Sequence, residues 1–125
     1  MSSMTRVFCY GSLKRGFGNH RLLDTSTFVG EAITEARYTM IPLGFFPGVI
    51  QSGNTSIRGE LYDVDEVTLR RLDRLEGHPT FYQRQEIDVL PVGVDESKWE
   101  QVSTYLLPES YLDGRVKSVE DGTWR

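Results

Sequence analysis

The sequence predicts an α+β fold in which one helix packs on a small, strongly curved sheet or barrel. Most apolar residues lie in short extended runs, one segment has a clear helical period, and five prolines are scattered between the runs as boundaries. A chain of 125 residues has the usual size of one domain, and 38% hydrophobic residues suffice for a core. We therefore expect residues 1–125 to form a single domain.

The predicted strands follow from the extended runs. Val7 to Tyr10 is short and apolar, which predicts a buried strand, and the alternation from Ala32 to Met40 predicts one longer, half-exposed strand. Residues 57–64 alternate between an apolar face and a polar face, and the polar face carries Arg58, Glu60 and Tyr62. Residues 82–90 and 102–107 complete the set of predicted strands.

The segment from Asp63 to Gly77 has the pattern of an amphipathic helix. Asp63 or Asp65 can cap its N-terminus, and Gly77 offers a left-handed stop. At about 100° per residue, the apolar residues gather on one side and three arginines on the other. The apolar side consists of Leu69, Leu72 and Leu75, with Glu76 among them. Glu76 therefore occupies a position where a core leucine is expected.

The tail from Pro108 onward is polar and rich in turn residues. It contains the stretches "LDGR" and "EDGTWR" and has no helical or strand period of its own. Its composition predicts a surface segment or a loosely ordered end.

Composition excludes several classes of function. The formal net charge of -4 and the pI near 5.2 disfavour nucleic-acid binding, which needs a concentrated basic surface. The single cysteine, Cys9, cannot form a disulfide within the chain and fits a reducing compartment. No stretch approaches the roughly 18 apolar residues of a membrane span, and the N-terminus lacks an apolar signal core. We expect a cytoplasmic protein that binds neither membranes nor nucleic acid.

A glutamate on the core face of a helix requires a chemical reason. Burial disfavours its charged form, and the negative end of the helix dipole disfavours it further, so both effects raise the pKa of Glu76. A carboxyl group with a raised pKa can hold and release a proton near neutral pH, as a general acid/base must. The alternative is that Glu76 pairs with Arg84 or faces solvent.

The residues after Gly77 form a turn and then begin a strand. If Glu76 points into a cavity, Tyr82 can bring its hydroxyl close to the carboxyl group. The alternative is a packed aromatic side chain whose hydroxyl reaches the surface. His78 is expected to be a turn residue, because no second histidine lies at metal-ligand spacing, and we predict no metal site.

The stretch "VFCYGSLKRGFGNHRLL", residues 7–23, combines a strand end with several glycines. Phe17 stands where a Walker loop needs lysine, and Arg21 stands where a dinucleotide fingerprint needs glycine, so nucleotide binding is disfavoured. Gly11 frees the chain to turn, and the N–H groups from Gly11 to Leu13 can converge on a small anion. Such a nest suits a carboxylate as well as a phosphate.

A serine nucleophile is a third possibility for this stretch. Ser12 and His20 could form a hydrolase pair, but "YGSLK" is not the G-x-S-x-G elbow. His20 follows Asn19 at an expected helical turn, where a structural role is favoured. Cys9 lies in an apolar run and is expected to be an inert core thiol.

Two separated segments resemble the gamma-glutamylcyclotransferase-like family, and most closely its gamma-glutamylamine cyclotransferase branch. They are residues 7–23 and "GELYDVDEVTLRRLDRLEGHPTFYQR", residues 59–84, in the right order along the chain. The likeness weakens beyond Pro91. It implies a small, strongly curved mixed β-barrel with flanking α-helices, a cavity at one end, and no cofactor.

The resemblance also implies roles for particular residues. Glu76 matches the acid/base of the family, and the residues that would hold a small-molecule γ-glutamyl substrate are Tyr10, Gly11, Ser12, Leu13 and Tyr82. The implied reaction converts an L-γ-glutamyl amine or γ-glutamyl amino acid to 5-oxoproline and a free amine. The identity of that amine stays open, and so does a second reading, a non-catalytic module that binds γ-glutamyl or other small carboxylate ligands.

Overall fold

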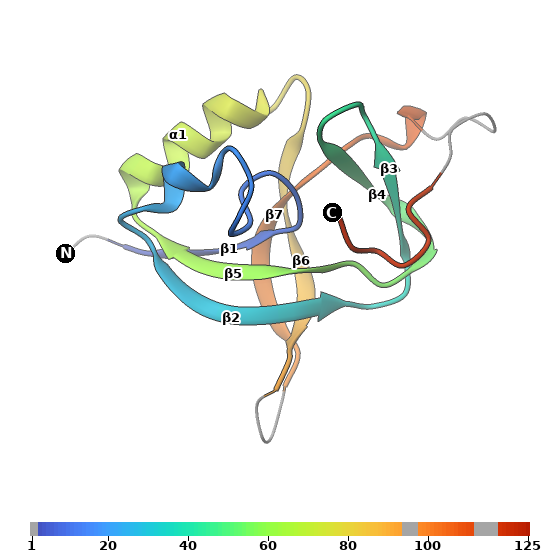
Figure 1. Ribbon diagram of the computed structural model, residues 1–125, viewed down its shortest axis with the longest axis horizontal. Helices are drawn as coiled ribbons and strands as arrows, with labels where there is room; N and C mark the ends of the chain where they lie inside the picture. Colours follow the sequence, from blue (N-terminus) through green and yellow to red (C-terminus); the bar gives the residue numbers. More distant parts are fainter. Residues whose placement is uncertain (1–2, 94–97, 112–117) are drawn as a thin grey trace.

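The computed structural model describes residues 3–93, 98–111 and 118–125 of the chain (Figure 1). Five strands form a closed barrel, in the order β1 (Thr5–Cys9), β5 (Arg58–Val64), β2 (Thr27–Thr34), β6 (Gln83–Pro91) and β7 (Glu100–Leu106). The strands β1 and β7 are parallel, and the other neighbours in the barrel are antiparallel. A mixed barrel accompanied by one α-helix confirms the predicted fold class.

The prediction of one long strand from Ala32 to Met40 is wrong. The chain leaves the barrel at the end of β2, and β3 (Tyr38–Pro42) pairs with β4 (Pro47–Thr55) in a separate two-stranded sheet. The backbone N–H of Arg37 donates to the carbonyl of Glu35, which turns the chain between the two sheets. Both stretches alternate in the same way, so the sequence pattern could not reveal that the strand partner changes.

Helix α1 (Glu66–Glu76) begins and ends as predicted. Its N-cap is Asp65, whose side chain accepts a hydrogen bond from the backbone N–H of Thr68 at 2.7 Å, and Gly77 ends it in the left-handed conformation with φ of 67°. Leu72 is buried and Leu69 packs against the core, whereas Leu75 is 42% exposed. The last turn of α1 therefore leaves the core and reaches the open end of the barrel.

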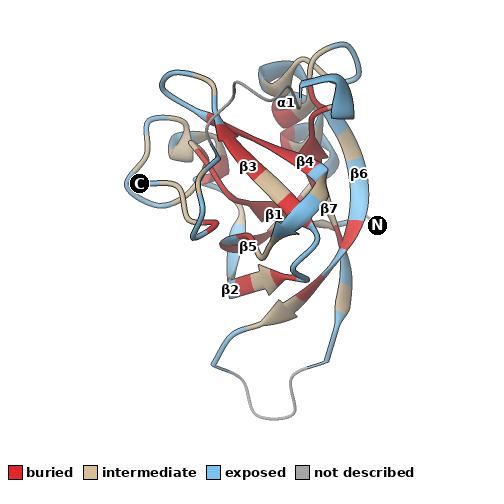
Figure 2. Ribbon diagram, turned by 90° about the vertical axis from the view of Figure 1, so that its right-hand side faces the viewer, coloured by how far each residue is buried: buried red, intermediate tan, exposed pale blue. Residues whose placement is uncertain are grey.

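Strand β1 lies between two clusters of buried side chains. Val7 and Cys9 belong to the cluster that also contains Leu72 of α1, while Phe8 and Tyr10 belong to the cluster that includes Met40 of β3. Figure 2 shows buried residues of β3 and β4 gathered in the middle of the molecule. Burial on both faces confirms the predicted buried strand and holds the loop after β1 in a defined place.

The C-terminal residues 118–125 dock against the sheets and are not a loose end. The N–H of Val119 donates to the carbonyl of Met40 at 2.7 Å, and the N–H of Arg58 donates to the carbonyl of Gly122 at 2.9 Å. Trp124 packs against the second core cluster. The composition of the tail predicted a surface segment or a loosely ordered end. It could not show these contacts, because they are made with strands far away in the sequence. Residues 112–117 of the predicted tail lie outside the described residues.

Two short 3-10 helices complete the fold, η1 (His20–Leu23) and η2 (Glu109–Tyr111). The first confirms the helical turn that we expected after Asn19. No helix in the part of the chain that the structure describes is long and apolar enough to cross a membrane.

Candidate active site

A cavity of about 510 Å³ opens at one end of the barrel. Its walls come from the loop after β1, the turn of the β3–β4 hairpin, the C-terminal end of α1 and the residues that follow it, and β7. Figure 1 shows the loop after β1 between α1 and this hairpin. The volume lies within the range of about 300–1,000 Å³ that is typical of small-ligand sites. All six predicted site residues, Tyr10, Gly11, Ser12, Leu13, Glu76 and Tyr82, line this one cavity.

Glu76 is the last residue of α1, and its carboxyl group faces the cavity. The side chain is half-buried, and burial raises the pKa of Glu76 to about 7. Its carboxyl group forms no hydrogen bond or ion pair with any other described residue, so both oxygens are available to a ligand. The alternative pairing with Arg84 does not occur, because Arg84 lies against Asp73 instead.

Asp73 lies one helical turn before Glu76 and is held from two sides. Tyr105 of β7 donates its hydroxyl to Asp73 Oδ1 at 2.6 Å, and Arg84 Nη1 of β6 lies 3.3 Å from Asp73 Oδ2. These contacts attach the end of α1 to two barrel strands. This cluster was not predicted from the sequence, although Asp73 stands three residues before Glu76 and so shares its side of the helix.

The loop from Gly11 to Leu13 presents unused backbone donors. None of the N–H groups of Gly11, Ser12 and Leu13 donates to another described group, while the carbonyl of Gly11 accepts from Lys14 at 3.0 Å. Gly11 is not among the glycines with a left-handed backbone. A β-carbon at this position would lie 2.8 Å from two ring carbons of Pro47, so glycine is required by the close approach of the hairpin.

Ser12 and His20 do not form a nucleophilic pair. The Oγ of Ser12 accepts a hydrogen bond from Asn19 Nδ2 at 2.9 Å, which leaves the hydroxyl proton of Ser12 free to be donated. The Nδ1 of His20 lies 2.9 Å from the carbonyl oxygen of Leu13. A carbonyl only accepts, so His20 donates from Nδ1 and supports the loop.

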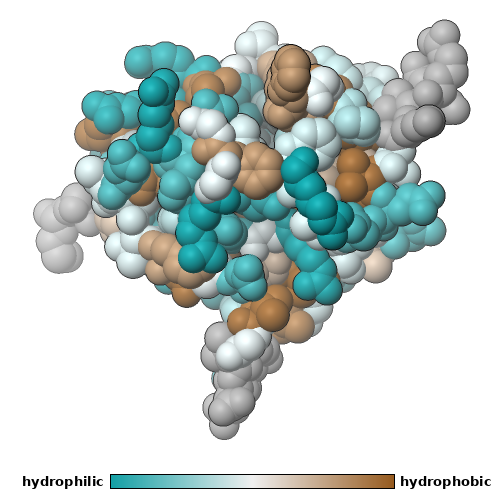
Figure 3. Space-filling view, viewed as in Figure 1, coloured by the Kyte–Doolittle hydropathy of each residue, from teal (hydrophilic) through white to brown (hydrophobic). Residues whose placement is uncertain are grey.

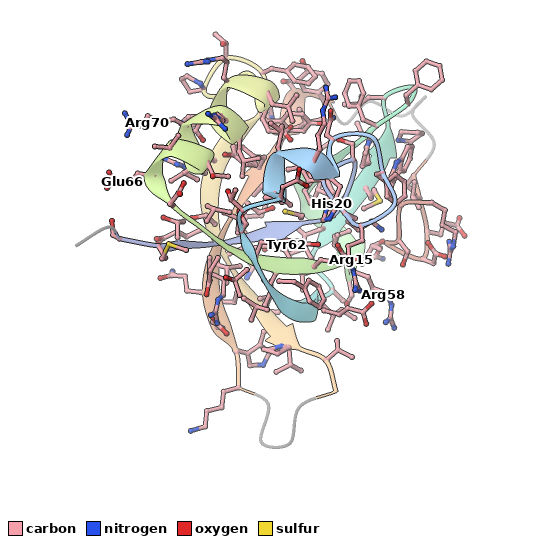
Figure 4. The ribbon with its side chains drawn as sticks, turned by 60° about the vertical axis from the view of Figure 1, so that its left-hand side comes forward. Arg15, His20, Arg58, Tyr62, Glu66 and Arg70 are labelled. Carbon is pink, nitrogen blue, oxygen red and sulfur yellow. The ribbon has the colours of Figure 1, made fainter. Side chains whose placement is uncertain are left out.

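A buried carboxylate lies beneath the loop after β1. It belongs to Glu60 of β5, which is 8% exposed. It accepts hydrogen bonds from the backbone N–H of Arg15 and from the hydroxyl of Tyr62, both at 2.9 Å. Arg15 and Tyr62 are labelled in Figure 4. The face of β5 that carries Glu60 is covered because the loop after β1 folds over it, and a strand pattern alone does not show such a cover.

The two tyrosines of the predicted site connect its walls. Tyr10 donates its hydroxyl to the carbonyl of Tyr105 at 2.6 Å, and Tyr82 donates to the carbonyl of Pro47 at 2.5 Å. Burial and the nearby Glu76 carboxyl raise the pKa of both phenols, so both stay neutral. The Tyr82 hydroxyl is therefore within electrostatic reach of Glu76, while its proton is directed at the hairpin.

Two other residues have roles that the sequence predicts. Cys9 lines the cavity as a buried thiol, and burial raises its pKa, so it is not a reactive thiolate. His78 accepts a hydrogen bond from the backbone N–H of Arg84 at 2.9 Å, which fits a turn residue. Among the described residues, no three His, Cys, Asp or Glu side chains lie close enough together to hold a metal ion.

An unpartnered carboxyl group with a pKa of about 7 and a row of free backbone donors share one cavity. This combination defines a small-molecule site suited to moving protons beside a carboxylate or a carbonyl. A family model described as gamma-glutamyl cyclotransferase, AIG2-like, matches residues 7–125. The chain therefore belongs to this family, and its membership supports a gamma-glutamylcyclotransferase activity in general.

Individual relatives agree with the family match. MJ1514 of Methanocaldococcus jannaschii is 41% identical over 109 residues, which cover 86% of this chain and 88% of that protein. The gamma-glutamylcyclotransferase family protein YtfP of Escherichia coli is 35% identical over 119 residues, or 95% of each chain. The crystal structure of a mouse AIG2-like protein matches with a TM-score of 0.83 at 26% identity, covering 98% of this chain and 88% of that one.

The family match also extends farther along the chain than the resemblance read from the sequence. That resemblance weakened beyond Pro91, whereas the family model continues to Arg125. The last third of the chain supplies β7, with Tyr105 in the cavity wall, and the docked C-terminal residues. Neither of the two motifs quoted above lies in this last third of the chain.

Proposed function

We propose that this protein converts an L-γ-glutamyl amine or γ-glutamyl amino acid to 5-oxoproline and a free amine, with Glu76 as general acid/base. The observation that carries the proposal is the half-buried Glu76 carboxyl group, which has a pKa of about 7 and no protein partner among the described residues. It lies in the same cavity as the free N–H groups of the loop from Gly11 to Leu13.

The reaction needs one group that first accepts and then donates a proton. The α-amino group of the substrate is mostly protonated at neutral pH and must lose a proton before its nitrogen attacks the γ-carbonyl carbon. A new C–N bond then closes the five-membered ring, and the original amide C–N bond breaks. The proton taken by Glu76 passes to the departing nitrogen. The ring nitrogen then gives up its second excess proton through the same carboxyl group, and the amine leaves as an ammonium ion, so no other reactant is consumed.

The loop after β1 is proposed to hold the glutamyl group. Its free N–H groups and the donatable hydroxyl proton of Ser12 suit the α-carboxylate or the γ-carbonyl oxygen of the substrate. Tyr10 and Tyr82 are proposed to contact the substrate with their rings, because both hydroxyl protons already go to backbone carbonyls. Since the ring closure is intramolecular, holding the folded substrate supplies much of the rate.

A substrate panel tests this proposal. The protein is incubated with γ-glutamyl amines and γ-glutamyl amino acids, and 5-oxoproline is followed by mass spectrometry. We expect product from at least one compound, with kcat/KM falling as the pH drops below about 7, because Glu76 is then protonated. Thermal stabilisation by these compounds without any product would instead support the binding-module reading.

The variant Glu76→Gln tests the role of the carboxyl group. We expect kcat to fall by about 10²- to 10⁴-fold, the usual contribution of a general acid/base, while the fold is retained. Glu86→Gln is the matched control, because Glu86 is exposed on β6 and does not line the cavity. A Glu76→Gln variant with a near-normal rate would remove Glu76 from the proposed mechanism.

A further inference from the structure

The mouth of the cavity is made of large apolar side chains that the proposed chemistry does not use. Phe45 is 99% exposed, Phe46 is 39% exposed and Leu75 is 42% exposed, and all three line the cavity. Phe17 and Phe81 line it as partly buried residues. Exposed apolar side chains that gather around a cavity commonly mark a binding surface.

The β3–β4 hairpin turn presents Phe45 at the edge of this opening. Gly44 and Phe45 form the turn, with φ of 91° at Gly44, and the N–H of Leu43 donates to the carbonyl of Phe46 at 2.8 Å. Hydrophobic side chains protrude over the tip of this hairpin in Figure 3. Because Phe45 lies beside Phe46 and Leu75 in the lining of one cavity, it belongs to an exposed apolar group and is not an isolated surface residue.

The residues that line the cavity fall into a buried group, called the inner wall here, and an exposed group at the mouth. The inner wall consists of buried residues that include Tyr10, Tyr82 and Tyr105. Glu76 is half-buried, directly follows the exposed Leu75 at the end of α1, and lines the cavity together with it. A substrate whose amide nitrogen lies at Glu76 can place the group attached to that nitrogen against the exposed lining residues, among them Phe45 and Phe46.

The charge of the cavity agrees with an apolar occupant at the mouth. Among the described lining residues no lysine, arginine or histidine is present, and Glu76 is the one carboxylate. A leaving group that carries its own carboxylate would find no cation in these walls to offset its lost hydration. An aryl or alkyl group would instead cover apolar surface that is now exposed to water.

We infer that the mouth is a subsite for an aryl or alkyl leaving amine, with Phe45 as a specificity-determining residue. This inference rests on the proposed function. It selects, among L-γ-glutamyl amides, those whose amine bears an uncharged apolar group, over those whose amine is an amino acid. The apolar group contacts the rings of Phe45 and Phe46 while the amide nitrogen lies at Glu76.

Three substrates with the same glutamyl group test the inference: γ-glutamylmethylamide, γ-glutamylbenzylamide and γ-glutamylalanine. We expect kcat/KM for the benzylamide to exceed that for the alanine compound by at least tenfold, and to exceed that for the methylamide. Equal values for the benzylamide and the methylamide, or a preference for the alanine compound, would overturn the inference while leaving the proposed function intact. The absence of 5-oxoproline from all three and from the whole panel of γ-glutamyl compounds would overturn the proposed function itself.

The variant Phe45→Ala assigns the preference to the hairpin. In the wild type we expect kcat/KM to be higher for the benzylamide than for the methylamide. In Phe45→Ala we expect the ratio of these two values to fall at least threefold. Val67→Ala serves as the control, because Val67 is 54% exposed in the first turn of α1 and does not line the cavity. A ratio unchanged in Phe45→Ala would show that Phe45 does not determine the specificity.

Discussion

The inner wall and the mouth of the cavity are built in opposite ways. On the inner wall the hydroxyls of Tyr10, Tyr82 and Tyr105 all donate to protein acceptors, with donor-acceptor distances of 2.5 to 2.6 Å. At the mouth, Phe45 and Leu75 are apolar and exposed to water. The inner wall is therefore held in one geometry by its own hydrogen bonds, whereas the mouth can change with little cost to the fold.

Glu76 lines the same cavity as these two regions. Burial raises its pKa to about 7, and no described residue occupies its carboxyl oxygens. The raised pKa explains how the protein tolerates an unpartnered carboxyl group. Its protonated form is the stable one in the folded chain until the pH approaches neutrality. Four substitutions test this contrast, in order of decreasing expected effect on the free energy of unfolding.

The largest expected effect comes from Glu76→Gln and depends on pH. The carboxyl pKa is about 7 in the folded protein and has its ordinary value of 4.5 in the unfolded chain. The stability contributed by the protonated carboxyl is therefore fully present below 4.5 and is lost as the pH rises through 7. At pH 8 and above, we expect the variant to be more stable than the wild type by up to about 3 kcal/mol, relative to their difference at pH 4.

Urea unfolding of both proteins between pH 4 and pH 9 measures this difference. Glu86→Gln is again the control, since Glu86 is exposed on β6. A difference between Glu76→Gln and the wild type that stays constant with pH would mean that burial does not raise the pKa of Glu76.

The second prediction concerns the contact between the loop after β1 and the hairpin. In Gly11→Ala the new β-carbon would lie 2.8 Å from the ring carbons of Pro47, so the loop must move. We expect a loss of about 1–3 kcal/mol in the free energy of unfolding and a fall of more than tenfold in kcat/KM. Gly18→Ala is the matched control in the same loop, because a β-carbon there meets no atom within 4 Å. Equal stabilities for the two variants would show that the loop adapts freely.

A third prediction tests the attachment of α1 to the barrel. Tyr105→Phe removes the hydroxyl that donates to Asp73 Oδ1, and leaves Asp73 with Arg84. We expect a loss of about 1–2 kcal/mol in the free energy of unfolding, the usual cost of removing one partner of a hydrogen bond to a charged group. Because Asp73 and Glu76 share the last turns of α1, kcat should fall more than KM changes. An unaltered unfolding midpoint would indicate that Arg84 alone holds Asp73.

The smallest expected effect on stability is at the mouth. Phe45 is 99% exposed, so Phe45→Ala should change the free energy of unfolding by less than about 0.5 kcal/mol. Thermal unfolding of the variant beside the wild type measures it. If Phe45→Ala lowered the free energy of unfolding as much as Gly11→Ala does, the mouth would contribute to the stability of the fold and would not be independent of the inner wall.

Much of the site could be predicted because its signals are local. The cap at Asp65, the leucine spacing and the stop at Gly77 predict α1 correctly, and together they put Glu76 at its end. The features that the sequence analysis missed arise from contacts between distant segments. The burial of Glu60 depends on the loop from Tyr10 to Asn19, and its partner Arg15 is 45 residues away in the sequence.

The class of fold and the helix that carries Glu76 follow from periodicity, caps and turn residues, which act over a few positions. The two motifs whose residues line one cavity were found through their resemblance to a known family. Three features could be seen only in the folded chain: β3 leaves the barrel, Gly11 is needed beside Pro47, and Phe45 joins Leu75 at the mouth. The physical reason is that each of these depends on which distant surfaces meet, and packing sets that only when the whole chain is folded.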